Sequence, residues 1–160
     1  MEKNIENSIR EKLRGETQKN ALDFVALAQA NGLSPVFHQE GCWVVGGTPE
    51  QRTGLIFIHG DEVKFGPPVP WVVWFTSCDF IDNGSVDDGL KEFAWAHASP
   101  CGKCRGDDWE KCNKGERIIF TKNVGRLCHC PLIFCEPDGT KLEQIIKLQL
   151  LLQPQQPSNN

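Results

Sequence analysis

Three of the eight cysteines stand within twelve positions, in the stretch CGKCRGDDWEKC at residues 101–112. Cys101 and Cys104 are separated by two residues, a spacing that lets one tight turn point two sulfurs at the same metal ion. Cys112 follows after seven residues, and LCHC at residues 127–130 can supply a fourth ligand from a separate element. Structural zinc sites take four such ligands in a tetrahedron. The spacing therefore predicts a structural Zn²⁺ site.

We predict Cys101, Cys104, Cys112 and Cys128 as the metal ligands. Along a strand alternate side chains share a face, so Cys128 and Cys130 point together and His129 points away. Cys128 is favoured, and Cys130 or His129 remain alternatives for the fourth position.

The basic residues around the cysteines fit this site. Four thiolates around Zn²⁺ leave a net negative charge that neighbouring cations must stabilise. Residues 101–126 carry seven Lys and Arg against four Asp and Glu, whereas the whole chain has a formal net charge of −4. The overall acidity argues against non-specific attraction to nucleic acid, so we do not expect a nucleic-acid partner.

A redox function is the alternative for the same cysteines. Cys-Gly-Lys-Cys has the spacing of thiol-disulfide exchange enzymes, in which the first cysteine lies at a helix N-terminus after a strand. Here Cys101 follows a predicted helix, and the RGDDWEK stretch after Cys104 lacks the apolar period of an active-site helix. A thiol-disulfide or redox-sensing protein that uses Cys101 and Cys104 is therefore the second hypothesis.

Other polar residues do not form a known catalytic pattern. HGDE at residues 59–62 places a histidine beside two carboxylates, but Gly-Asp is typical of a hairpin turn. No spacing selects His38 with Cys42 or Cys78 as a nucleophilic pair, and buried cysteines commonly pack as small apolar groups. A nucleophile elbow, a P-loop and a dinucleotide fingerprint are all absent from the sequence. We therefore expect a non-enzymatic binding module.

Tryptophans suggest where a partner would bind. The chain has five Trp and nine Phe but no Tyr. Trp71 and Trp74 have an odd separation, so in a strand they face opposite sides of the sheet. If one of them packs in the core, the other can line a surface for a small molecule or a protein partner.

Apolar periods predict the elements that position these residues. Ile5, Ile9 and Leu13 recur every four residues, and a second apolar stripe ends at the stop signal Asn31-Gly32. Two helices, or one helix broken near Gly15, are expected. The short runs rich in Val, Ile, Phe and Trp that follow predict antiparallel strands within residues 35–47, 53–66 and 69–80.

The second half of the chain alternates helices and strands. Ser85 is expected to cap a helix over residues 85–99, with Asp88 in the capping-box position. ERIIFTK at 116–122 and CPLIFCEP at 130–137 are predicted strands. Thr140 and Glu143 form a second capping box that opens a helix over 141–153.

These elements predict one α+β domain over residues 1–153. An antiparallel sheet packs with N-terminal, middle and C-terminal helices, residues 101–130 form a zinc-stapled C-terminal lobe, and residues 154–160 form a disordered tail. The N-terminus lacks the apolar core of a secretory signal, and no apolar run reaches the roughly 18 residues of a membrane span. We expect a cytoplasmic protein, where clustered cysteines more often bind metals than form disulfides.

Residues 95–152 resemble the C-terminal part of a group of short, functionally uncharacterised microbial proteins. The matching stretches are WAHASPCGKC, CNKG, RIIF, LC and FCEPDG. The resemblance implies Cys101, Cys104, Cys112 and Cys128 as a set and implies no activity. This chain departs from the group at Glu136, where Asn is usual, and in TKNVGRLC, which lacks the expected Gly and Phe.

Overall fold

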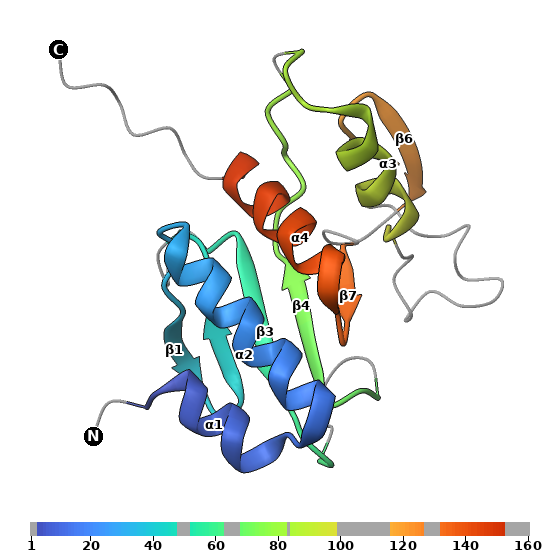
Figure 1. Ribbon diagram of the computed structural model, residues 1–160. Helices are drawn as coiled ribbons and strands as arrows, with labels where there is room; N and C mark the ends of the chain where they lie inside the picture. Colours follow the sequence, from blue (N-terminus) through green and yellow to red (C-terminus); the bar gives the residue numbers. More distant parts are fainter. Residues whose placement is uncertain are drawn as a thin grey trace, which may run out of the picture.

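A computed structural model describes residues 3–47, 52–62, 68–82, 84–98, 116–126 and 132–152. These residues form an α+β fold with helices on an antiparallel five-stranded sheet, as predicted (Figure 1). The helices are α1 (Ile5–Lys12), α2 (Gly15–Ala30), α3 (Asp88–Ala96) and α4 (Gly139–Leu151). The strands are β1 (Val36–Gln39), β2 (Cys42–Val44), β3 (Gly54–Ile58), β4 (Trp71–Phe75), β5 (Glu116–Ile119), β6 (Lys122–Arg126) and β7 (Ile133–Cys135).

The sheet has the strand order β1-β2-β3-β4-β7. Its first four strands follow one another as antiparallel neighbours, and β7 pairs with β4 in the register Val73 to Phe134. Within the described ranges, strands β5 and β6 pair with each other alone, as a separate hairpin. The hairpin and α3 lie beyond the β7 edge of the sheet (Figure 1).

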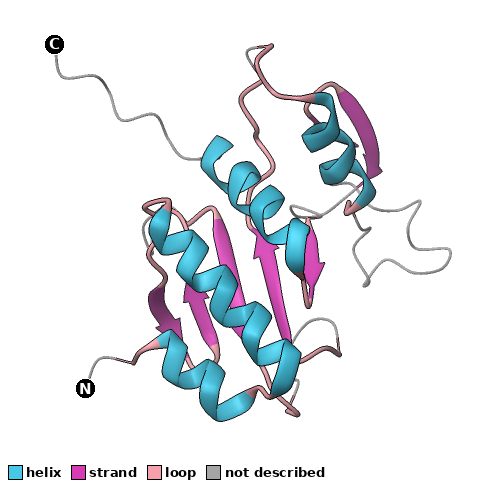
Figure 2. Cartoon of the chain, in the orientation of Figure 1, coloured by secondary structure: helices cyan, strands magenta, loops and turns pink. Residues whose placement is uncertain are grey.

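The two faces of the sheet differ in cover. Helices α1, α2 and α4 lie across one face, which we call the inner face (Figure 2). In β4 the side chains of Trp71, Val73 and Phe75 point to this face and are fully buried, at 0% exposure. Trp74 points to the opposite, outer face and is half-buried. The prediction that Trp71 and Trp74 face opposite sides is confirmed.

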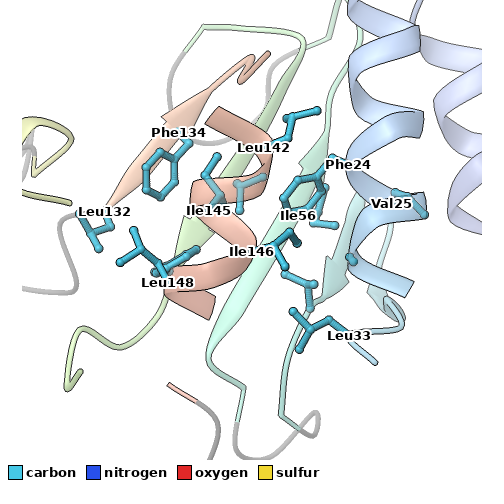
Figure 3. Packing of buried hydrophobic residues seen from close by; sticks show 14 of the residues in the cluster. Phe24, Val25, Leu33, Ile56, Leu132, Phe134, Leu142, Ile145, Ile146 and Leu148 are labelled. Atoms are coloured by element: carbon cyan, nitrogen blue, oxygen red, sulfur yellow. The ribbon is translucent and has the colours of Figure 1, made fainter. Parts of the chain in front are cut away.

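Helix α4 packs in the core against the sheet and α2. Its buried side chains Leu142, Ile145, Ile146 and Leu148 lie between Phe134 of β7 and Ile56 of β3, close to Phe24 of α2 (Figure 3). Each of these side chains is at most 6% exposed. Burying one large apolar side chain stabilises a fold by roughly 1.5–3 kcal/mol, so α4 is a major contributor to the core.

A polar side chain of α4 is buried where the helix meets the sheet. Gln149 is only 1% exposed, and its amide Nε2 donates a hydrogen bond to Thr53 Oγ1. The amide occupies the space into which Cβ atoms at Gly46 and Gly54 would project, at 2.5 Å from its Nε2 and 2.4 Å from its Oε1, respectively. The two glycines therefore make room for the Gln149 amide.

The two N-terminal helices are separate. Helix α1 ends at Lys12, and the Arg14 guanidinium group donates from Nη1 to the carbonyl oxygens of Arg10 and Leu13 at 2.7 Å and of Glu11 at 2.9 Å. Carbonyls in the last turn of a helix have no partner within the helix. The Arg14 side chain thus satisfies the end of α1 and marks the break.

Both predicted capping residues are wrong. Helix α3 is capped by Asp87, whose carboxylate accepts a 2.8 Å hydrogen bond from the Gly89 amide, and not by Ser85. The intervening Val86 is buried in the core, and Asp87 after it has the extended backbone of an N-cap residue. Helix α4 begins at Gly139 after Asp138, one residue before the predicted cap Thr140.

The strand predicted over residues 116–122 is confirmed for Glu116–Ile119, which form β5, but it ends early because the chain turns at Phe120 and Thr121 into β6. Phe120 has a positive φ of 53°, a conformation usually taken by Gly, Asn or Asp. Its ring stacks on Phe80 at 4.9 Å between centroids. That contact holds a bulky residue in a turn that the sequence does not mark.

Glu136 is the second non-glycine residue in a left-handed conformation among the described residues, with a φ of 43° immediately before Pro137. Asn tolerates this conformation better than Glu, because its short side chain can hydrogen-bond locally. Glu136→Asn is therefore expected to raise the free energy of unfolding by about 1 kcal/mol, measured by denaturant titration.

The control for this prediction is Glu136→Gln, which removes the same charge but keeps the long side chain. Both variants weaken the 3.3 Å hydrogen bond that Thr17 Oγ1 donates to Glu136 Oε1. An Asn variant no more stable than the Gln variant would show that backbone strain at residue 136 is negligible.

Among the described residues, no helix is both long enough and apolar enough to cross a membrane.

Candidate functional site

The predicted metal ligands Cys101, Cys104, Cys112 and Cys128, with their alternatives His129 and Cys130, lie outside the described residues. Within the ranges that are described, no group of three or more His, Cys, Asp or Glu side chains is arranged to hold a metal ion.

The described residues on either side of the cysteines are paired with one another. Ala98, three positions before Cys101, forms an antiparallel bridge with Leu132, which follows Cys130 by two positions. Glu116 stands four positions after Cys112 and pairs with Arg126, two positions before Cys128. The chain thus enters and leaves each cysteine-bearing segment at paired backbone positions.

Helix α3 contacts the strands next to both of these pairings. The Trp95 indole Nε1 donates a 2.9 Å hydrogen bond to the Ile119 carbonyl in β5, and Lys122 Nζ of β6 lies 5.0 Å from the Trp95 ring. On the other side of the helix, the Phe93 ring stacks on Phe134 of β7 at 5.6 Å. The helix that precedes Cys101 therefore contacts the hairpin before Cys128 and the strand after it.

Two cysteines within the described residues, Cys42 and Cys135, are not activated thiols. Cys42 is 1% exposed, and burial raises the pKa of its thiol to about 11, against a smaller opposing effect of the Arg52 charge. His38 does not serve it as a base, because its Nε2 lies 2.8 Å from Arg52 Nη1. Burial, followed by the charge of Glu136, raises the pKa of the exposed Cys135 thiol. The pairing of His38 with Cys42 as a nucleophile is therefore excluded.

A cleft of about 740 Å³ lies at one end of the sheet. It is formed where the α1–α2 junction, the β1–β2 turn and the chain after β3 meet. Its lining residues are Glu11, Lys12, Leu13, Arg14, Thr17, Gln39, Glu40, Gly41, Phe57, Ile58, His59, Gly60, Asp61, Glu62 and Pro70. The HGDE stretch does form a turn, as predicted, and that turn is one wall of the cleft.

Two glycines allow the walls of the cleft to approach each other. Gly41 and Gly60 have positive φ values of 73° and 66°. A Cβ on Gly60 would lie 2.9 Å from the Lys12 carbonyl oxygen, and one on Gly41 would lie 3.2 Å from the Ile58 carbonyl oxygen. The amides of His59 and Gly60 both donate to the Pro70 carbonyl, at 2.8 and 3.0 Å, which closes the turn.

His59 is a neutral side chain in this cleft at pH 7. Partial burial, and secondly the charge of Lys12, lower the pKa of its imidazole below the ordinary value of 6.5. Its ring stacks on Phe57 with centroids 5.6 Å apart. A neutral imidazole offers one donor and one acceptor nitrogen.

Trp71 and Trp74, the two tryptophans considered for a partner surface, lie in different environments. Trp71 is buried beside Phe24, with ring centroids 6.0 Å apart, so it does not line a surface. Trp74 lies on the outer face beside Phe57, at 6.1 Å, and Phe57 continues to His59 in the cleft. We call Trp74, Phe57 and His59 the aromatic row. It leads from the outer face of the sheet into the cleft.

Sequence reasoning missed the cleft because its walls come from three separate parts of the chain. The only local signals were glycines at turns, Gly41 and Gly60, whose close approach to Lys12 and Ile58 depends on the folded sheet.

Comparison with protein-family models, with curated proteins and with solved structures finds no match to this chain.

Proposed function

We propose that the chain is a zinc-binding, non-enzymatic module that binds a small-molecule or protein partner. A structural zinc held by Cys101, Cys104, Cys112 and Cys128 stabilises the C-terminal lobe of residues 101–130. The observation that supports it is the pairing of the flanks, Ala98 with Leu132 and Glu116 with Arg126.

The pairing matters because only a few residues separate the paired positions from the predicted ligands. An extended chain spans at most 3.3–3.6 Å per residue, so Cys101 lies within about 11 Å of Ala98, and Cys128 lies within about 7 Å of Arg126. Paired strand residues have Cα atoms about 5 Å apart. These two pairings bring the flanks of the cysteine-bearing segments together, which would lower the entropic cost of bringing the predicted ligands to one ion.

The donor set favours a structural role over a catalytic one. Four thiolates fill the tetrahedron around Zn²⁺ and leave no position for water or substrate. Basic side chains that can offset the thiolate charge surround the cysteines in the sequence: Lys103, Arg105, Lys111, Lys114 and Arg126.

Metal analysis of protein purified without added zinc tests the proposal. We expect one zinc per chain, lost in Cys101→Ser and in Cys112→Ser. Because structural zinc contributes about 10–16 kcal/mol of apparent binding free energy in small domains, its loss should also unfold the lobe. NMR signals of the β5–β6 hairpin should then lose their dispersion. The matched control is Cys135→Ser, which removes an exposed cysteine outside the ligand set and should retain the metal.

Two results would refute the zinc site: a metal-free protein with a folded hairpin, or a Cys135→Ser variant that loses as much zinc as Cys101→Ser.

Thiol titration distinguishes the zinc site from the redox alternative. Zinc-bound thiols become reactive only when a chelator is added, whereas a redox pair at Cys101 and Cys104 would cycle with dithiothreitol and have a lowered thiol pKa.

A further inference from the structure

The charged side chains that line the cleft differ in whether they already interact with another group. Two cationic side chains, Lys12 and Arg14, stand against the carboxylates of Glu11, Glu40, Asp61 and Glu62. Arg14 is engaged by carbonyl oxygens at the end of α1. Glu40 forms ion pairs with Lys3 and, at 3.7 Å, with Lys12.

The other three carboxylates of the cleft have no such partner among the described residues. Within the described part of the chain, no ion pair involves Glu11, Asp61 or Glu62, and all three are exposed. The charge that remains available in the cleft is therefore negative. A negative cleft raises the local concentration of cations and repels anions.

The aromatic row gives the cleft an apolar wall beside this charge. Phe57 and His59 line the cleft, and Trp74 extends the row onto the outer face. Faces of aromatic rings attract cations and also pack against apolar groups. A ligand that carries a positive group on an apolar body would use both features.

Size and donor arrangement exclude a bare metal ion as the preferred ligand. The volume of about 740 Å³ falls within the roughly 300–1,000 Å³ range of small-molecule sites. The Asp, Glu and His side chains of the cleft are not grouped as metal ligands.

We infer that this cleft binds a small organic cation, an amine or guanidinium compound whose apolar part lies on the aromatic row and whose charge faces Asp61, Glu62 and Glu11. The inference deepens the proposed function, because it names the ligand class of the binding module. It does not depend on the metal.

Three probes that share one apolar body test the inference. They are 2-phenylethylamine, which is a cation at pH 7, 2-phenylethanol, which is neutral, and 3-phenylpropionate, which is an anion. Binding is followed by the NMR shifts of the His59, Gly60 and Asp61 amides in the full chain. We expect saturable shifts with the amine, weaker binding of the alcohol and no binding of the anion. Added salt should weaken amine binding.

Charge-removing variants locate the site. Asp61→Asn combined with Glu62→Gln should weaken amine binding by about fivefold or more, the effect of losing one or two exposed charge contacts. Phe57→Leu should weaken it by about threefold through loss of the ring face. Glu92→Gln is the matched control, since Glu92 is an exposed carboxylate on α3 outside the cleft.

Absence of amine binding, equal affinity for the three probes, or an equal effect of Glu92→Gln would overturn the inference. Zinc is measured in the same sample, so the two proposals fail separately. Zinc-loaded protein that ignores the amine refutes the ligand class alone, and zinc-free folded protein that binds the amine refutes the metal site alone.

Discussion

Replacing Gly46 with alanine is expected to lower the free energy of unfolding by about 3 kcal/mol. Gly46 has a φ of 78°, and a Cβ there would lie 2.5 Å from Gln149 Nε2 and 2.8 Å from Thr53 Oγ1. The buried Gln149 amide cannot move aside without breaking its hydrogen bond to Thr53. Backbone strain and overpacking therefore add, and equilibrium denaturation in urea measures the sum.

Gly32→Ala separates these two contributions. Gly32 has nearly the same φ, 76°, but nothing lies within 4 Å of the position of its Cβ. Its substitution should cost only the backbone strain, about 1 kcal/mol. Equal losses in the two alanine variants would mean that the Gln149 amide exerts no steric constraint.

A double variant tests the contact directly. Gln149→Ala alone removes the hydrogen bond to Thr53 and leaves a cavity, so it also destabilises the fold. When Gly46→Ala is combined with Gln149→Ala, the new methyl group has room. The loss in the double variant should be smaller than the sum of the two single losses by about 1 kcal/mol or more.

The second large effect is expected at Trp71. Trp71→Ala should lower the free energy of unfolding by about 3–5 kcal/mol, because it removes a fully buried indole between the sheet and α2. Trp74→Ala, three positions away on the outer face, should cost only about 1 kcal/mol, the order of a half-buried aromatic contact. Thermal unfolding followed by far-UV circular dichroism compares the two variants.

This pair of variants also tests which face of the sheet the helices cover. If Trp74→Ala destabilised the protein as much as Trp71→Ala, the outer face would have to carry a packed layer of its own. The small outer cluster of Cys42, Val44 and Leu55 with Phe57 would then be part of a second core.

Strand positions were predictable because local composition determines them. Runs such as WVVWF consist of strand-forming side chains, and successive side chains of a strand point to opposite faces. Both the strand and the faces of Trp71 and Trp74 therefore followed from the sequence. Helix starts were less predictable, since Ser85 and Asp87 are both good caps. The burial of Val86, a tertiary effect, decides between them.

The β5–β6 hairpin was missed for a related reason. Its turn residue Phe120 carries no turn signal and takes its conformation beside Phe80, a residue 40 positions earlier. The residues of β6, KNVGR, contain a single strand-forming side chain, Val124. Pairing with β5 makes them a strand, and pairing cannot be read from one segment.

The two candidate sites also differ in how far the sequence alone can predict them. The cysteine types and spacing predict a metal site, because ligand chemistry resides in the residues themselves. The choice among Cys128, His129 and Cys130 does not follow from spacing. The cleft forms because Lys12, Gly41 and Gly60 lie close together in the fold. They are far apart in the sequence, so this proximity cannot be predicted from the sequence alone.

Strand β7 has a consequence for the order of folding. Strands β1 to β4 pair with their neighbours along the chain and can associate as soon as they are synthesised, but β7 completes the sheet only after residues 76–132 have been made. Contacts between distant segments form slowly, because a long intervening loop must close first. A metal bound within that loop would shorten its effective length, so zinc supply would set the pace at which the last strand and α4 dock.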